Sequence, residues 1–342
     1  MSGLEGAGDA SLLYIVGTDQ PERLKIEGNR FSLAGTTDLY KLLGRDRPFH
    51  RLQVTPNYFR QGRQAELSTY THILNLITEA EENGRVLENL RKLLKGLRGK
   101  VINHPDAVRR STRDQVAKRL AGTPGLLAPR AVRLRGAKPA HAEKLLEQAR
   151  LNYPIIVRRV GTHTGKIVGL FDYASEAAAA LDGDGEYIAT EFVDFASADG
   201  LYRKYRFFFI GPQLIFRHML VSDSWNVHAK DRTRIMAERP HLLAEEEGLF
   251  GRADGDFPDE VHATLHAVRD RMGLDYFGMD FGLMQDGRVL LFEANATMNF
   301  YPFLPDPRFE YVKRCEAPAR RAFRELLDLA PTSASPDFEP LA

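Results

Sequence analysis

The stretch from Asp275 to Phe300, DYFGMDFGLMQDGRVLLFEANATMNF, constrains the fold of this chain more than any other. Two runs rich in β-branched and aromatic residues flank the dipeptide Asp286-Gly287, which is typical of a β-hairpin turn. A two-residue turn at this dipeptide pairs Gln285 with Arg288. The segment therefore predicts two antiparallel strands whose register can be counted outward from the turn.

Three oxygen-bearing side chains share one face of this predicted hairpin. The count places Asp280 directly opposite Glu293, and Asn295 lies two residues further along on the same face. Two carboxylates so close repel each other unless a proton or a cation lies between them. Carboxylate and amide oxygens are ligands that suit Mg²⁺. We therefore expect a metal site here, with an exposed hairpin that carries incidental acids as the alternative.

Length and composition exclude several classes of protein. The chain has 342 residues, which suggests about two domains, and its single cysteine, Cys315, excludes an internal disulfide framework or a multi-cysteine metal site. Lys plus Arg total 47 and Asp plus Glu total 46, a net charge of +1 that argues against a nucleic-acid coat or a polybasic membrane protein. No apolar run approaches the ~20 residues of a membrane span, and no signal peptide is visible, so we expect a cytoplasmic protein.

The pattern of apolar residues changes along the chain. Strand-like runs at 12–16, 71–77 and 100–103, with a helical pattern at 84–97, predict parallel βαβ units of the α/β class. From Pro154 onward, many strand-like segments joined by Gly or Pro turns predict antiparallel hairpins of the α+β class. A helical pattern at 111–121 precedes this second part, two more at 175–183 and 259–273 interrupt it, and one at 310–329 closes it.

A glycine-bounded loop, Gly161-Thr162-His163-Thr164-Gly165, separates two strand-like segments. Glycines and small hydroxyl residues allow backbone N–H groups to approach phosphate oxygens, so the loop is a candidate phosphate-binding site. It is not a Walker P-loop, because three residues instead of four separate its glycines and Ile167 follows Lys166 where Ser or Thr is required. An ordinary solvated strand end is the alternative for the neighbouring Arg158.

The spacing of Asp280, Glu293 and Asn295 resembles the metal-binding signature of the ATP-grasp superfamily, which includes D-alanine–D-alanine ligase, glutathione synthetase and the ribosomal-protein glutamate ligase. The resemblance reaches upstream to about His104. It implies an N-terminal α/β pre-ATP-grasp domain over 11–105, a central ATP-grasp subdomain with the glycine loop over 106–187, and a C-terminal subdomain with the metal hairpin over 188–330. Residues 1–10 and 331–342 are expected to be disordered.

The same resemblance implies which residues bind the nucleotide. Arg158 and Arg113 stand where the family usually has Lys, and both would bind phosphate. Glu191 would accept the exocyclic amine of adenine, and Phe192 and Val193 would line the adenine slot. A buried strand end without ligand contacts is the alternative for Glu191 to Val193.

Further positions are implied for the substrates. Arg217, a clamp on the phosphoryl group or the substrate carboxylate, and Asn299 are the expected catalytic residues. The D-alanine ligase branch has Arg two residues before the metal Asp, whereas this chain has Gly278, which favours the glutathione-synthetase-like or glutamate-ligase-like branch. The residues expected to contact substrate are Arg206, His218, Asn226, His228 and Thr297.

The resemblance implies a ligase that uses ATP and two Mg²⁺ ions. A small-molecule or peptide carboxylate would attack the γ-phosphate to give an acyl phosphate, and an amine would then displace phosphate, forming an amide and leaving ADP. Neither a membrane nor a nucleic-acid partner is expected, and a homodimer stays open. A phosphotransferase on the same fold and a non-catalytic ATP-binding protein are the alternatives.

Overall fold

The computed structural model describes residues 12–20, 25–27, 30–32, 35–44, 48–62, 65–136, 138–161 and 167–328. The terminal segments 1–10 and 331–342, for which we expect disorder, lie outside the described residues, as do Thr162, His163, Thr164 and Gly165 of the glycine loop. Within the described ranges, no helix has the length and apolar character that crossing a membrane requires.

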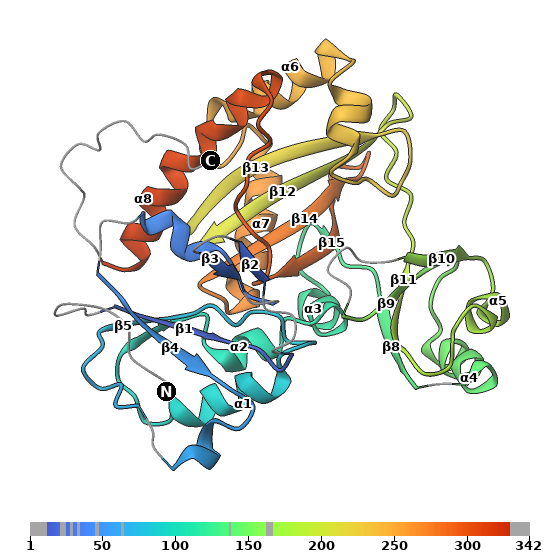
Figure 1. Cartoon of the computed structure of the whole chain (residues 1–342). Coiled ribbons are helices and arrows are strands. Elements are labelled where there is room, and N and C mark those ends of the chain that lie inside the picture. Colours follow the sequence, from blue (N-terminus) through green and yellow to red (C-terminus); the bar gives the residue numbers. More distant parts are fainter. Residues whose placement is uncertain are drawn as a thin grey trace.

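The N-terminal part is a parallel four-stranded sheet (Figure 1). Its strands, in spatial order, are β4 (His50–Val54), β1 (Leu12–Gly17), β5 (His72–Asn75) and β6 (Lys100–Ile102). Helix α1 (Gly84–Leu93) connects β5 to β6 and buries Val86, Leu87 and Leu90. The predicted βαβ arrangement is confirmed, although the helix ends at Leu93 and not at Leu97. A short helix, α2 (Pro105–Arg109), follows, and a two-stranded hairpin joins β2 (Lys25–Glu27) to β3 (Arg30–Ser32).

A second, antiparallel four-stranded sheet forms a separate lobe (Figure 1). Its strands, in spatial order, are β10 (Ile167–Phe171), β9 (Ile155–Arg159), β11 (Glu186–Glu191) and β8 (Ala131–Arg135). The helices α4 (Pro139–Ala149) and α5 (Ala174–Ala179) belong to this lobe. Leu146, Val157 and Tyr187 are among the residues of its own apolar core, which is distinct from the cores of the rest of the molecule.

The third sheet is five-stranded and carries the predicted metal hairpin. Its strands, in spatial order, are β13 (Gln213–Ser222), β12 (Tyr202–Ile210), β14 (Tyr276–Leu283), β15 (Val289–Asn295) and the short β7 (Leu126–Leu127). The helices of this part are α3 (Arg113–Leu120), α6 (Pro240–Gly248), α7 (Asp259–Met272) and α8 (Glu316–Leu326). The mixture of α/β and α+β parts confirms the predicted fold class.

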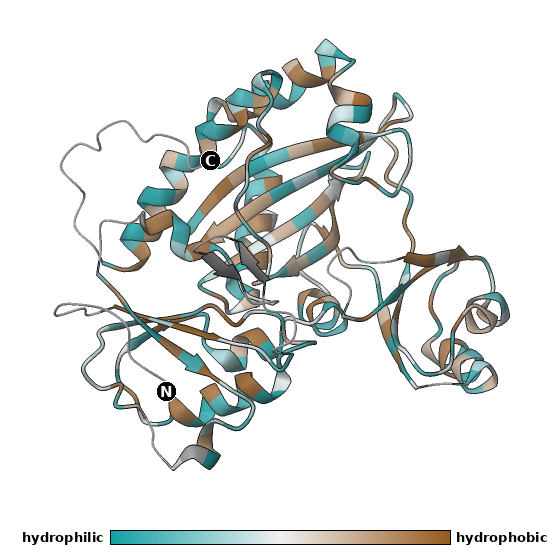
Figure 2. Ribbon diagram, in the orientation of Figure 1, coloured by the Kyte–Doolittle hydropathy of each residue, from teal (hydrophilic) through white to brown (hydrophobic). Residues whose placement is uncertain are grey.

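Helix α8 links the third sheet to the N-terminal sheet. Its Phe323 belongs to one buried cluster with Tyr14 of β1, Phe208 of β12 and Tyr276 of β14. Figure 2 shows apolar residues along the strands that enclose this region. The N-terminal sheet and the five-stranded sheet therefore share a core and pack as one unit, whereas the small lobe packs around a core of its own. The space between the three parts lies between this unit and the small lobe.

The turn between β14 and β15 differs from the prediction. The backbone N–H of Met284, not of Gln285, donates to the carbonyl of Arg288 at 2.9 Å, so the loop has three residues instead of two. Gly287 adopts a positive φ of 84°, a conformation that a three-residue hairpin loop needs and that glycine allows. The predicted pairing of Gln285 with Arg288 is therefore wrong.

A β-bulge restores the register that the count from the turn predicted. Phe281 pairs with Leu291, yet Asp280 pairs with Glu293, so Phe292 is the extra residue in β15. The longer turn shifts the pairing by one residue and the bulge shifts it back. The predicted opposition of Asp280 and Glu293 is confirmed for this reason, and not because the turn has two residues.

Candidate active site

A cavity of about 1310 Å³ lies between the three parts of the molecule. Its lining includes Tyr14 of the N-terminal sheet, Ile156 of the small lobe and Asp280 of the five-stranded sheet. A smaller cavity of about 100 Å³ adjoins it beside Gly161, at the base of the glycine loop. Apart from Gly161, each predicted site residue within the described ranges lines the large cavity; these are Arg113, Arg158, Glu191, Phe192, Val193, Arg206, Arg217, His218, Asn226, His228, Asp280, Glu293, Asn295, Thr297 and Asn299.

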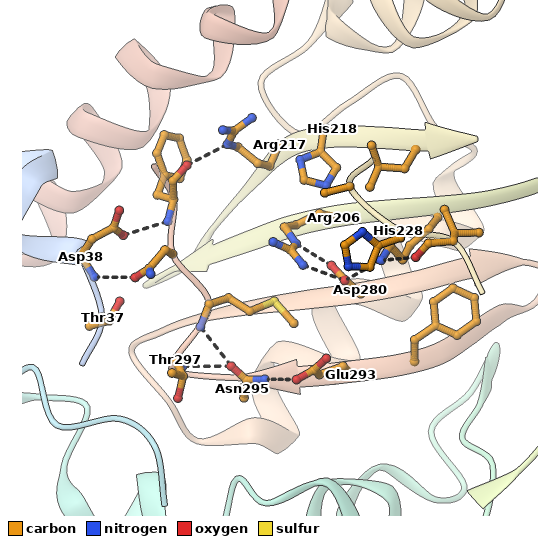
Figure 3. Close-up of a pocket in the computed structure, with 18 of the residues that line it drawn as sticks. Thr37, Asp38, Arg206, Arg217, His218, His228, Asp280, Glu293, Asn295 and Thr297 are labelled. Atoms are coloured by element: carbon orange, nitrogen blue, oxygen red, sulfur yellow. Dashed lines mark hydrogen bonds and ion pairs between the residues drawn. The ribbon is translucent and has the colours of Figure 1, made fainter. Parts of the chain in front are cut away.

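Four of these residues form one row across the five-stranded sheet (Figure 3). His218 of β13 pairs with Arg206 of β12, Arg206 pairs with Asp280 of β14, and Asp280 pairs with Glu293 of β15. Directly paired residues point to the same face of a sheet, so all four side chains turn toward the cavity. The sheet therefore presents an imidazole, a guanidinium and two carboxylates in a line.

Two β-bulges flank this row. Arg217 is the extra residue in β13, since Arg206 pairs with His218 while Phe207 pairs with Phe216. Phe292 is the extra residue in β15. A bulge re-aims the side chains beside it, and here each bulge adjoins a member of the row. Both disturbances of the sheet thus occur at the level of the site.

The two carboxylates of the row are each paired with a guanidinium. Arg206 binds Asp280 through two hydrogen bonds of 2.6 and 2.7 Å, and Nη2 of Arg113 lies 3.0 Å from Oε2 of Glu293. Burial alone would raise the pKa of Asp280, but Arg206 and Lys204 outweigh it and hold that pKa below its usual range. Asp280 is therefore charged at neutral pH.

The donor set partly fits a divalent metal. Asp280 and Glu293 offer hard carboxylate oxygens from adjacent strands, and both already interact with positive charge. Asn295 is oriented differently, because its Oδ1 accepts hydrogen bonds from the backbone N–H groups of Thr297 and Met298 while its Nδ2 donates to Glu293 at 2.6 Å. For Mg²⁺ to bind, Asp280 would have to exchange a hydrogen bond with Arg206 for the metal, and Asn295 would have to share or turn its amide oxygen.

Arg158, the second predicted phosphate cation, lies near the Glu293 end of the row. Arg158 is at the end of β9 beside the glycine loop, and burial, with Arg113 nearby, lowers its pKa to about 10. It still carries its charge at neutral pH. Arg113 and Arg158 thus come together from α3 and the small lobe, at the place where Glu293 also lines both cavities.

The predicted adenine residues lie at the end of β11. Glu191 is held by its neighbours, since it accepts hydrogen bonds from Nε of Arg130 at 2.9 Å and from the backbone N–H of Asn152 at 2.7 Å. The N–H of Phe192 donates to the carbonyl of Pro154, and its ring packs edge-on against Trp225 with centroids 5.5 Å apart. These contacts make a rigid apolar wall, while the adenine contact itself stays a prediction.

The segment after β15 is clamped from two sides (Figure 3). Asp38 of the N-terminal part accepts hydrogen bonds from the backbone N–H groups of Phe300 and Tyr301 at 2.8 and 2.9 Å. From the other side, Arg217 donates to the carbonyl oxygens of Phe300 and Pro302. Asn299 accepts a hydrogen bond from the backbone N–H of Asp38 at 2.9 Å. Arg217 and Asn299 therefore position this loop, and their catalytic roles stay predictions.

The end of the cavity near β13 is strongly cationic. Burial, together with Arg206, Arg217, Arg232 and Lys204, holds the pKa of His218 well below its usual value, so its imidazole is neutral at pH 7. Arg217 has no carboxylate partner within the described part of the chain, and its guanidinium lies 4.2 Å from the centre of the Phe303 ring. Such surroundings favour an anionic group.

Sequence reasoning missed several residues that line the cavity. Asp38 and Glu79 come from the N-terminal part, for which no motif was found, and Lys204 and Arg232 come from β12 and from a turn of π-helix after β13. Glu79 stands in the run TEAEENG, whose density of acids is a signal that could have drawn attention to it. Asp38 carries no comparable local signal.

Comparisons with known proteins give a match in structure alone. No protein-family profile and no curated protein matches the sequence. The structure is similar to that of VanG D-Ala:D-Ser ligase from Enterococcus faecalis, with a TM-score of 0.51 and 13% identity over 93% of this chain and 98% of that one. Two further matches are the RimK domain protein ATP-grasp from Sphaerobacter thermophilus (TM-score 0.48, 12% identity, 92% and 98% covered) and the ATP-grasp ligase PsnB in complex with precursor peptide PsnA2 and AMPPNP (TM-score 0.47, 15% identity, 95% and 99% covered).

Proposed function

Because the chain has the ATP-grasp fold, we propose that it is an ATP- and Mg²⁺-dependent ligase that joins a carboxylate to an amine through an acyl phosphate. The observation that carries this proposal is the row of His218, Arg206, Asp280 and Glu293, which faces the cavity that Arg113 and Arg158 also line. It brings cations that suit phosphate and carboxylates that suit a metal to one cavity.

The size of the cavity supports a reaction between two substrates. Its volume of about 1310 Å³ exceeds the ~300–1,000 Å³ of a typical site for one small molecule. A nucleotide held along the Arg158 side would leave room at the cationic end beside Arg217 and His218. That end suits the carboxylate of an acid substrate, whose oxygen would attack the γ-phosphate.

In the proposed reaction each group of the chain has a role that its position suggests. Arg158 and Arg113 bind phosphate oxygens, and Asp280 and Glu293, with Asn295 as a third donor, would hold Mg²⁺. When bound, Mg²⁺ supplies positive charge that offsets the charge developing on the transferred phosphoryl group. The loop held by Asp38 and Arg217 forms the wall that the acid substrate meets. The wall at Phe192 and Val193 would seat the adenine.

The structure also bears on the branch of the superfamily. Gly278 faces Asn295, and a Cβ atom at position 278 would lie 2.6 Å from Sδ of Met298. No larger side chain fits there without displacing Met298. We therefore propose a glutathione-synthetase-like or glutamate-ligase-like substrate range for this chain, and not that of the D-alanine ligase branch.

The test is an acyl-phosphate trap. The full chain is incubated with ATP, Mg²⁺, hydroxylamine and pools of amino acids, dicarboxylic acids or peptides with free carboxylates, and with Glu293→Gln as the inactive control. The proposal predicts a hydroxamate and ADP in equal amounts from at least one pool. AMP with pyrophosphate would contradict it, and a stable phosphate ester would instead indicate a phosphotransferase. ATP binding without turnover would indicate a non-catalytic protein.

A further inference from the structure

Glu79 differs from the other carboxylates that line the large cavity. Asp280, Glu293 and Glu191 each pair with an arginine, and Asp38 accepts two backbone N–H groups. Within the described part of the chain, Glu79 has no cationic partner. Its side chain accepts one hydrogen bond, from the backbone N–H of Glu81 at 3.1 Å.

The position of Glu79 is fixed by the backbone around it. It follows the end of β5, where the loops after parallel strands gather, and its N–H donates to the carbonyl of Gly35 at 3.1 Å. A Cβ atom on Gly35 would lie 2.7 Å from Cβ of Glu79, so only glycine allows the two loops to approach this closely. The backbone that carries Glu79 is therefore held against the loop of Gly35.

Glu79 faces the reaction centre from the N-terminal wall. It lines both the large cavity and the small one, together with Arg158, Glu293 and Thr297. It therefore lies between the base of the glycine loop and the segment that follows the metal hairpin. In the proposed reaction, this is the region next to the phosphate being transferred.

The acids nearest Glu79 are of its own sign, and the arginines close by pair with those acids, Arg133 with Glu81 and Arg113 with Glu293. Burial and the neighbouring Glu81, Glu82 and Glu293 raise its pKa to about 7. A partly buried carboxyl among acids costs free energy unless a cation reaches it, and no Lys or Arg of the described residues forms an ion pair with Glu79, although Arg158 lines the same cavities. No group of three or more acidic, histidine or cysteine side chains that could hold a metal occurs among the described residues, so a protein-built metal cage does not account for Glu79.

We propose that Glu79 binds the protonated amino group of a substrate. The assignment rests on the proposed ligase function, which brings an amine to the acyl phosphate next to Glu79. An amine that arrives there as an ammonium ion must pass one proton to Glu79 or to water before its nitrogen attacks and phosphate leaves. The same chemistry would serve an amino group carried by the amine co-substrate or one carried by the acid substrate. In either case, the chain selects a substrate with a primary ammonium group at this wall.

The first test measures binding and needs no turnover. Glycinamide, a small primary ammonium ion, is titrated into the full chain with Mg²⁺ and the non-hydrolysable analogue AMPPNP, and acetamide serves as the uncharged control. We expect glycinamide but not acetamide to bind the wild type, and Glu79→Gln to weaken glycinamide binding about tenfold to a hundredfold, the range for a hydrogen bond to a charged group. Glycinamide that does not bind the wild type, or binds both proteins equally, overturns the assignment.

The second test uses turnover with an acid and amine that pass the hydroxylamine assay. Glu79→Gln should raise the KM of the amino-bearing substrate about tenfold or more while the KM of ATP stays within twofold. N-acetylation of the amine or of the acid identifies which substrate carries the recognised group. Glu79→Asp provides a second variant with a retained charge, and Glu88→Gln, a carboxylate paired on the surface of α1, is the matched control. Unchanged kinetics in Glu79→Gln would overturn the assignment and leave the ligase proposal intact.

Discussion

The substitution Glu79→Gln should make the protein more stable at neutral and alkaline pH. Glu79 has a pKa of about 7 in the folded chain against a reference value of 4.5, because burial and three neighbouring acids disfavour its charged form. The folded state therefore holds a proton on Glu79 between these two pH values that the unfolded chain has lost. The contribution of Glu79 to the free energy of unfolding is therefore fully present below about pH 4.5, where both states are protonated, and it is lost as the pH rises toward and through 7.

The size of the effect follows from the difference between the two pKa values. A difference of about 2.5 pH units corresponds to about 3 kcal/mol of unfolding free energy at 1.36 kcal/mol per unit. Glutamine is neutral at every pH and resembles the protonated acid in shape. The wild type and Glu79→Gln should therefore be equally stable near pH 4, and the variant should be about 3 kcal/mol more stable above pH 8.

The assay is urea unfolding of the two full-length proteins, followed by far-UV circular dichroism from about pH 4 to about pH 9. The difference between the two curves isolates Glu79, because every other titrating group is common to both proteins. Glu88→Gln should not reproduce the pattern, since Glu88 is paired with Arg91 and Arg109 at the surface. The reasoning would be refuted if the difference in unfolding free energy between the two proteins did not change with pH, or if the wild type became more stable relative to the variant as the pH rose.

Three further substitutions test the proposed roles of other residues. Glu293→Gln should abolish ADP formation and leave the circular dichroism spectrum unchanged, and retained turnover would exclude Glu293 as a metal ligand. Arg158→Ala should raise the Kd of ATP about tenfold to a hundredfold in calorimetry, the range for one charge-assisted hydrogen bond, and an unchanged Kd would count against its placement on phosphate. Asp38→Asn should raise the KM of the acid substrate without changing the Kd of ATP, because the charge that holds Phe300 and Tyr301 is lost; a change confined to ATP binding would contradict that role.

The metal hairpin shows how far the sequence can predict a site. Turn chemistry at Asp286-Gly287 and alternation along the flanking strands are local properties, so the two strands and their shared face could be predicted. The bulge at Phe292 could not, because it depends on packing at a distance, including a ring contact with Phe195 at 4.7 Å between centroids. The opposed pair was found although the details of the turn were wrong.

Contributions from the N-terminal part were missed for a different reason. Asp38 meets Asn299 across 261 positions of sequence, and nothing near either residue indicates that contact. Strand β8 was also missed, since Arg133 and Arg135 interrupt its apolar pattern. Arg133 is accommodated there by ion pairs with Glu81 and Asp114, which come from other parts of the fold. Contacts between residues so far apart in the sequence cannot be predicted from local sequence patterns.

The most direct test of the proposed acyl-phosphate chemistry is the fate of the carboxylate oxygen. An acid that passes the hydroxylamine assay is labelled with ¹⁸O in its carboxylate and converted with ATP, Mg²⁺ and an amine by the full chain. The released phosphate is then examined by ³¹P NMR for the shift that ¹⁸O causes. Attack of the carboxylate on the γ-phosphate predicts one ¹⁸O atom in each phosphate released. Unlabelled phosphate, or label found in AMP, would contradict the account.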